Sequence, residues 1–100
     1  MTFEEHVTKA LDELPADIAR QLENVAIVVE DEHPDEPDLF GLFEGGGDFM
    51  PDKVTIYRLP LEADFPDPVE LEQEIRITVL HELGHYFGLD EGRLEELGYE

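Results

Sequence analysis

The segment from Asp67 to Phe87 constrains the fold of this chain more than any other part of the sequence. Asp67 can cap a helix, Pro68 suits the first helical position, and Glu70 completes a capping box. At about 100° per residue, the second half of this helix is apolar nearly all round its axis. Along the whole helix the apolar side chains are Leu71, Ile75, Ile77, Val79, Leu80, Leu83 and Phe87. Such a helix needs neighbours on most sides, so we expect it to be central and buried.

Two shorter helical segments are predicted at the start of the chain. Thr2 with Glu5 forms a capping box for a first helix, and apolar residues then recur at helical spacing as far as Leu14. Pro15 ends this helix and can open a second helical turn that extends to Leu22.

Three strands and two loops are predicted between these helices and the long helix. The short apolar run 25–29 is β-branched and favours a buried strand, and further strands are predicted over 39–43 and 54–59. The polar segments 30–37 and 61–67 are predicted to be loops. After the long helix, we expect a short final helix from Glu91 to about Leu97. Nothing marks a second domain, so residues 1–100 are expected to form one.

The charge of the chain excludes several classes of partner. It carries 27 acidic and 6 basic side chains, a net charge of −21. Nucleic acid and anionic membrane surfaces attract clustered lysine and arginine, so we expect neither as a partner. There is no cysteine, which excludes disulfides and thiolate zinc sites. The N-terminus lacks the pattern of a secretory signal, so we expect a cytoplasmic protein, with its oligomeric state left open.

The long helix contains the motif HExxH, formed by His81, Glu82 and His85. The two histidines lie about 40° apart around the axis and one turn apart along it, so their imidazoles can bind one Zn²⁺ ion. Glu82 flanks that face and can reach a water molecule on the zinc without being a ligand. In this arrangement the zinc acidifies the water, and Glu82 acts as the catalytic general base that moves its proton to the leaving amine.

A third ligand is predicted shortly after the motif, which reads HExxHxxGxxE with an additional aspartate. Gly88 lets the chain leave the helix sharply. A residue about ten positions after His81 can then fold back to the metal. Glu91 holds that position and is the predicted third ligand, with Asp90 as the alternative. Either acid can instead serve at the N-terminus of the last helix, where the helix dipole favours negative charge.

Other interpretations of these residues stay open at this point. The HExxH pattern can arise by coincidence on a helix with partly exposed histidines. His6 and His33 are expected to be solvated side chains rather than ligands. The segment Gly41–Gly45 is either an ordinary strand or an edge strand that pairs with the backbone of a substrate peptide.

The sequence resembles the minimal zincin-like metallopeptidases, a family of small bacterial proteins predicted to be zinc proteases. The resemblance covers most of the chain from Gly41 onward. It rests on GLFEG (41–45), VTIYRLPLE (54–62) and RITVLHELGHYFGLDEGRLEELGY (76–99). It implies a compact α+β fold in which a small mixed sheet packs against the metal-binding helix. It also implies ligands at His81 and His85, a base at Glu82, and an acidic third ligand at Asp90 or Glu91.

We therefore expect a zinc metallopeptidase that acts on a peptide or protein substrate. Because the chain is strongly acidic, cationic peptides should bind best. Two alternatives belong to other classes. One is a metal-binding domain with little or no proteolysis, and the other is an acidic interaction module in which the motif is incidental.

Overall fold

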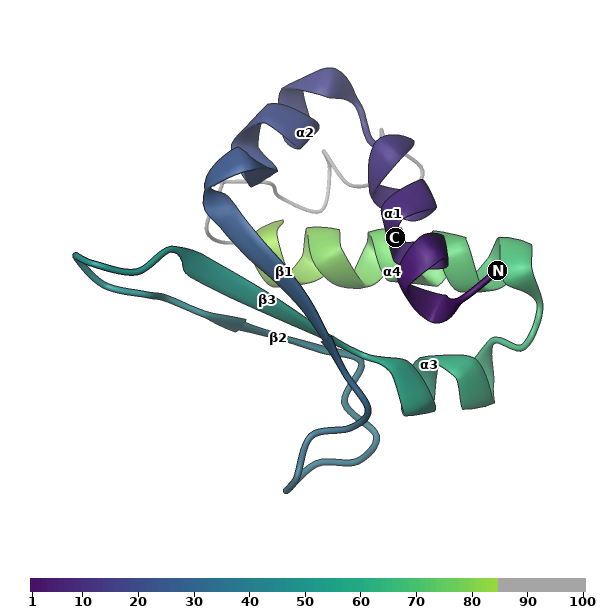
Figure 1. The fold of residues 1–100 in the computed structure, drawn as a ribbon. Helices are drawn as coiled ribbons and strands as arrows, with labels where there is room; N and C mark the ends of the chain where they lie inside the picture. Colours follow the sequence, from purple (N-terminus) through teal and green to yellow (C-terminus); the bar gives the residue numbers. More distant parts are fainter. Residues whose placement is uncertain (85–100) are drawn as a thin grey trace.

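The three-dimensional structure is a computed structural model that describes residues 1–84. The longest helix within these residues is α4 (Pro68–Gly84), and Asp67 caps it as the sequence predicts. Asp67 Oδ2 accepts hydrogen bonds from the backbone N–H groups of Val69 and Glu70, at 3.1 and 3.0 Å. Figure 1 shows α4 beside α1 and the strands, which it contacts together with α3. The prediction of a central helix is confirmed.

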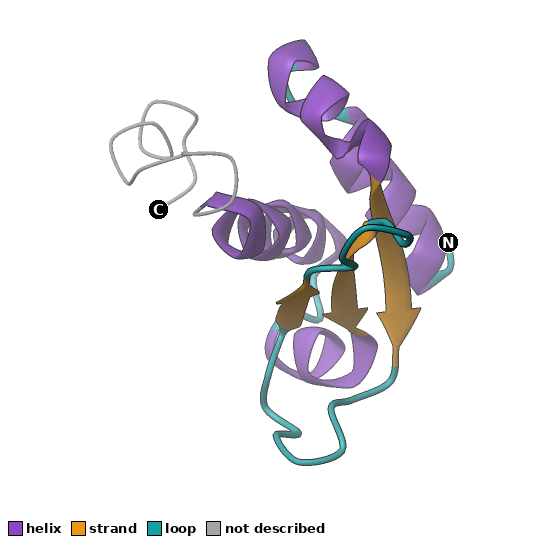
Figure 2. Ribbon diagram, turned by 90° about the vertical axis from the view of Figure 1, so that its left-hand side faces the viewer, coloured by secondary structure: helices purple, strands orange, loops and turns teal. Residues whose placement is uncertain are grey.

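Three strands form one mixed sheet in the order β1-β3-β2 (Figure 2). They are β1 (Val25–Glu30), β2 (Gly41–Glu44) and β3 (Asp52–Tyr57). The central strand, β3, pairs in parallel with β1 and antiparallel with β2. The sheet and the helices pack together, which confirms the α+β class with a small mixed sheet against the HExxH helix. The predicted C-terminal helix lies outside the described residues.

Burial along the strands follows their order in the sheet. Residues 54–57 of β3 are all buried, because this strand has a neighbour on each side. The prediction that residues 25–29 form a buried strand is only partly correct, because β1 lies at an edge of the sheet and these residues are half-buried. The strand predicted over 39–43 begins two residues later, at Gly41.

The N-terminal region confirms the two predicted helical segments. They are α1 (Phe3–Asp12) and α2 (Ala16–Gln21), and a 3₁₀ turn over Leu22–Asn24 follows them. Thr2 Oγ1 accepts a hydrogen bond from the Glu5 N–H at 3.2 Å and so caps α1.

The loop predicted over residues 61–67 is wrong in its first half, because a helix, α3 (Arg58–Asp64), follows β3 directly. Pro60, which follows the strand predicted over 54–59, occupies the first turn of α3, where a missing N–H costs no intrahelical hydrogen bond. The N–H of Leu59 donates to Asp31 O at 2.9 Å, and an ion pair of Arg58 with Glu62 (2.7 Å) supports the helix one turn along.

The main core lies where α4 meets α1, α3 and β3. Its buried side chains alternate along β3 and recur at helical spacing along the two long helices: Phe3, Val7, Ala10, Val54, Ile56, Leu61, Leu71, Ile75, Val79 and Leu83. A smaller cluster of Leu14, Ile18 and Leu80 attaches the α1–α2 corner to a neighbouring face of α4. Within residues 1–84, no helix has both the length and the apolar character of a membrane span.

Candidate active site

Glu82, the predicted general base, lies against the edge strand β2. Its side chain is half-buried, and Oε2 accepts a hydrogen bond from the backbone N–H of Phe43 at 3.2 Å. Burial raises the pKa of the Glu82 carboxyl above its usual value, and the Phe43 N–H and the nearby His81 ring lower it by less. The structure therefore holds this carboxylate at a defined place beside the sheet.

The contact with Phe43 uses the outer edge of β2. Leu42 is paired with Thr55 of β3, and Phe40 O accepts the Tyr57 N–H at 2.9 Å. The backbone N–H and C=O groups of these alternate residues therefore point toward β3. Phe43 belongs with Gly41 to the other alternate set, and its N–H points outward to Glu82. Of the two alternatives left open for this segment, the structure shows an edge strand, whereas pairing with a substrate stays a prediction.

Gly41 allows β2 to pass this close to α4. A Cβ atom at this position would lie 2.6 Å from Thr78 Cγ2, 3.3 Å from Thr55 O and 3.5 Å from Glu82 Cγ. The first of these distances is too short for any real Cβ contact, so a side chain here would push the strand and the helix apart.

His81 lies on the exposed side of α4, and the expectation that the motif is buried is wrong for this residue. At about 100° per residue, the buried side chains of α4 fill an arc of about 240°. His81 falls in the remaining arc, together with the exposed Glu70, while Glu82 falls within the buried arc. The apolar residues thus surround most of the helix and leave one solvent-facing strip, which contains His81.

The exposed His81 ring fits a role as a metal ligand. Within residues 1–84, no hydrogen bond or ion pair occupies its nitrogens. A catalytic zinc site needs imidazole nitrogens that are free to coordinate, with one side of the ion open to substrate. The described part of the chain contains no group of three or more ligand side chains. The other predicted ligands, His85 and Glu91 with Asp90 as the alternative, lie outside the described residues.

Two residues near Glu82 were missed at the level of sequence. The Phe43 backbone N–H contacts Glu82, and Thr78 packs over Gly41. The GLFEG segment carries a signal for the strand, since a glycine opens a short apolar run. Backbone contacts between residues 39 positions apart leave no periodic pattern, so the partner of that strand was not predictable.

His6 is not solvated, contrary to expectation. Its Nδ1 lies 2.6 Å from Glu72 Oε2, and Lys9 Nζ lies 3.4 Å from the other oxygen of that carboxylate, whose side chain is only 8% exposed. The hydrogen bond with His6, more than any other interaction, lowers the pKa of the Glu72 carboxyl. These residues join α1 to α4 on turns far from the motif, so their role is structural.

His33 has a local role in the loop between β1 and β2. Its Nδ1 accepts hydrogen bonds from the N–H groups of Asp35 and Glu36, each at 3.1 Å, and its ring meets Tyr57 edge-on. The side chain is half-buried, so the expectation that it is solvated is only partly correct.

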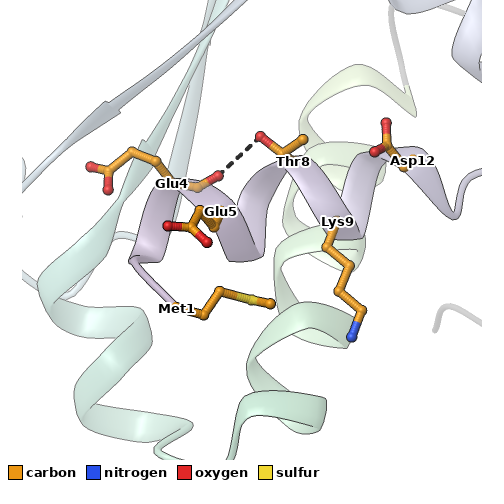
Figure 3. A pocket seen from close by; sticks show the side chains of 6 residues that line it. All are labelled: Met1, Glu4, Glu5, Thr8, Lys9 and Asp12. Carbon is orange, nitrogen blue, oxygen red and sulfur yellow. Dashed lines mark hydrogen bonds between the residues drawn. The ribbon is translucent and has the colours of Figure 1, made fainter.

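A shallow surface hollow lies over α1 and is separate from the motif (Figure 3). It is lined by Met1, Glu4, Glu5, Thr8, Lys9 and Asp12. The Lys9 side chain also pairs with Glu72, and Thr8 Oγ1 donates to the Glu4 carbonyl at 3.1 Å. These polar groups of the hollow thus make contacts within α1 and between α1 and α4.

A family model described as zincin-like metallopeptidase matches residues 22–99. The matched range includes the whole sheet, α3, α4 and every residue of the predicted metal site. No curated protein matches the chain at a significant level.

Proposed function

This chain belongs to the zincin-like metallopeptidase family, and we propose that it hydrolyses peptide bonds with zinc as its cofactor. One observation carries the proposal: the glutamate of the HExxH motif is held against the outer edge of a strand, with 3.2 Å between its Oε2 and the Phe43 nitrogen. This contact supports the proposal because it brings the proposed general base to a backbone edge that an extended peptide could join.

The proposed zinc ligands are His81, His85 and an acid, Glu91 or its alternative Asp90. The donor set is two imidazoles and one carboxylate, which is a combination found in catalytic zinc sites. When bound, the ion polarises the peptide carbonyl and acidifies a water molecule.

Glu82 moves the proton in this proposal. One Oε atom takes a proton from the attacking water while the oxygen of that water joins the carbonyl carbon. The same carboxyl then gives the proton to the amide nitrogen as the C–N bond breaks. Phe43 holds the carboxylate at the strand edge during both transfers, and its N–H restrains the side chain to the side where the peptide lies.

The proposed substrate is an extended peptide with basic residues. An extended backbone can pair with the outer edge of β2. The net charge of −21 attracts cationic peptides at long range, and dissolved salt screens such attraction. Raising the ionic strength should therefore increase the KM for a lysine-rich peptide more than the KM for a neutral peptide of equal length.

The test is turnover of a peptide library by the native chain and by Glu82→Gln, with zinc content measured in parallel. Loss of this base should lower turnover by at least about a hundredfold while zinc stays bound. Glu74→Gln, a half-buried glutamate two turns earlier on α4, is the matched control and should keep full activity. Equal turnover by native chain and Glu82→Gln would contradict the proposal. Bound zinc without any hydrolysis would instead favour a non-catalytic metal-binding domain.

A further inference from the structure

The loop that joins β2 to β3 presents two large apolar side chains to solvent. Phe49 is 98% exposed and Met50, its neighbour, is 70% exposed. Single apolar residues are ordinary on protein surfaces, but two adjacent ones of this size at the end of a hairpin indicate a contact surface. We call these two residues the apolar tip.

The backbone of the loop is closed in a way that only glycine permits. The Gly46 N–H donates to Asp52 Oδ1 at 3.1 Å, and a Cβ atom at Gly46 would collide with the carbonyl oxygens of Met50 and Pro51. Gly47 has a φ of 76°, in the left-handed region. The chain is therefore folded back tightly beneath the apolar tip, which holds Phe49 and Met50 outward.

The apolar tip continues the strand edge on which Glu82 lies. Phe43 contacts Glu82, and the loop begins two residues further along the same strand. Figures 1 and 2 show that the hairpin projects from the same side of the molecule as the motif-bearing end of α4. An extended peptide advances about 3.3 Å per residue, so one that follows β2 from Glu82 comes level with the loop after about three or four residues.

The surroundings of the apolar tip are acidic. Asp48 precedes Phe49, and Glu44 and Asp52 stand at the two sides of the hairpin base. Lys53 is the cation near this base, and it is paired with Glu44 at 3.5 Å. A ligand that suits this surface therefore has a large apolar group with basic groups on either side of it.

We propose that the apolar tip is a substrate-binding element, which contacts a large apolar side chain of a peptide bound along β2. That side chain lies about three or four residues from the bond to be cleaved and has basic residues beside it. The inference rests on the proposed function, because the peptide is the substrate of the Glu82 site.

Binding is measured by fluorescence anisotropy on full-length protein carrying Glu82→Gln, with zinc present, so that the result does not depend on turnover. The probe is a fluorescein-labelled Lys/Gly/Ala peptide with one central Phe, compared with the same peptide carrying Ser in place of Phe. Phe49→Ser with Met50→Ser removes the apolar tip. Val69→Ser is the matched control, because Val69 is 71% exposed and lies at the opposite end of α4.

The Phe peptide should bind about tenfold more weakly to the protein without the apolar tip, and the Ser peptide should bind both proteins alike. Val69→Ser should change neither affinity, and thermal unfolding should be unaltered in all variants, since these side chains are exposed. In the active background, removal of the apolar tip should raise KM and leave kcat unchanged.

Equal affinity for the Phe peptide with and without the apolar tip would overturn the inference, as would failure of the peptide to bind. So would sedimentation showing a native dimer that becomes monomeric without Phe49 and Met50, because the partner would then be a second copy. Failure of the proposed function appears separately, as absence of turnover by the native chain.

Discussion

Among single residues, Gly41 sets how closely β2 can approach α4 at the candidate site, because it has no side chain. Gly41→Ala places a methyl group against Thr78 Cγ2, where the available distance is 2.6 Å. The β-branched Thr78 has little freedom to turn away on a helix. We expect a loss of about 1–3 kcal/mol in the free energy of unfolding, measured by urea denaturation, together with reduced peptide turnover.

Thr78→Ser provides the control for this prediction, because it removes the methyl group that the new side chain meets. The double variant Gly41→Ala/Thr78→Ser should recover most of the stability lost by Gly41→Ala alone. Additive losses in the two variants would show that the contact between β2 and α4 is not the cause.

Glu72 should make stability depend on pH in the acid range. Its carboxylate faces His6 and Lys9 of α1, while Arg76, one turn along α4, pairs with Glu13 instead. The pKa of Glu72 is lowered in the folded chain, chiefly by the hydrogen bond with His6. Its contribution is therefore fully present above the ordinary carboxyl pKa, about 4.5, and is lost as the pH falls through the lowered value.

The measurement is thermal unfolding of the native chain and of Glu72→Gln between neutral pH and about pH 3. The native chain should be the more stable of the two above about pH 5, and this advantage should shrink as the pH falls. A constant difference between the two proteins across that range would show that Glu72 ionisation is not linked to folding.

At the scale of elements, α4 holds the molecule together through two separate faces. Leu80 is fully buried with Leu14 and Ile18, so it attaches the α1–α2 corner to α4. Leu80→Ala should lower the free energy of unfolding by about 2–4 kcal/mol, because the cavity is not refilled. Val69→Ala, an exposed site on the same helix, should change it by less than about 0.5 kcal/mol in urea denaturation. Similar losses at both sites would contradict the assignment of Leu80 to a packed cluster.

Elements with a strong local signal were predictable from sequence, and elements without one were not. The caps at Thr2 and Asp67 and the periodicity behind them identified α1 and α4, because these signals act within a few residues. The helix α3 was missed because its sequence lies between a predicted strand and a polar segment and contains a proline, although a first-turn proline is tolerated. It forms where the Asp31 carbonyl accepts the Leu59 N–H, a partner contributed by a distant part of the chain.

At the scale of the whole molecule, the sequence located His81 and Glu82 on the central helix but did not predict what surrounds them. His81 and Glu82 lie on the helix expected, and the family match covers the whole motif. The exposure of His81 depends on which arc of α4 the neighbouring elements leave open, and the contact of Glu82 depends on the docking of β2. Both are consequences of assembly and follow from no local pattern in the sequence.

The proposed zinc site on α4 is tested by elemental analysis of protein purified without chelators. The native chain should hold about one zinc ion, and His81→Ala should lose it. His33→Ala should keep the ion, because the His33 ring accepts hydrogen bonds from N–H groups of its loop and is not a predicted ligand. A native chain free of zinc, or equal zinc in native chain and His81→Ala, would contradict the account.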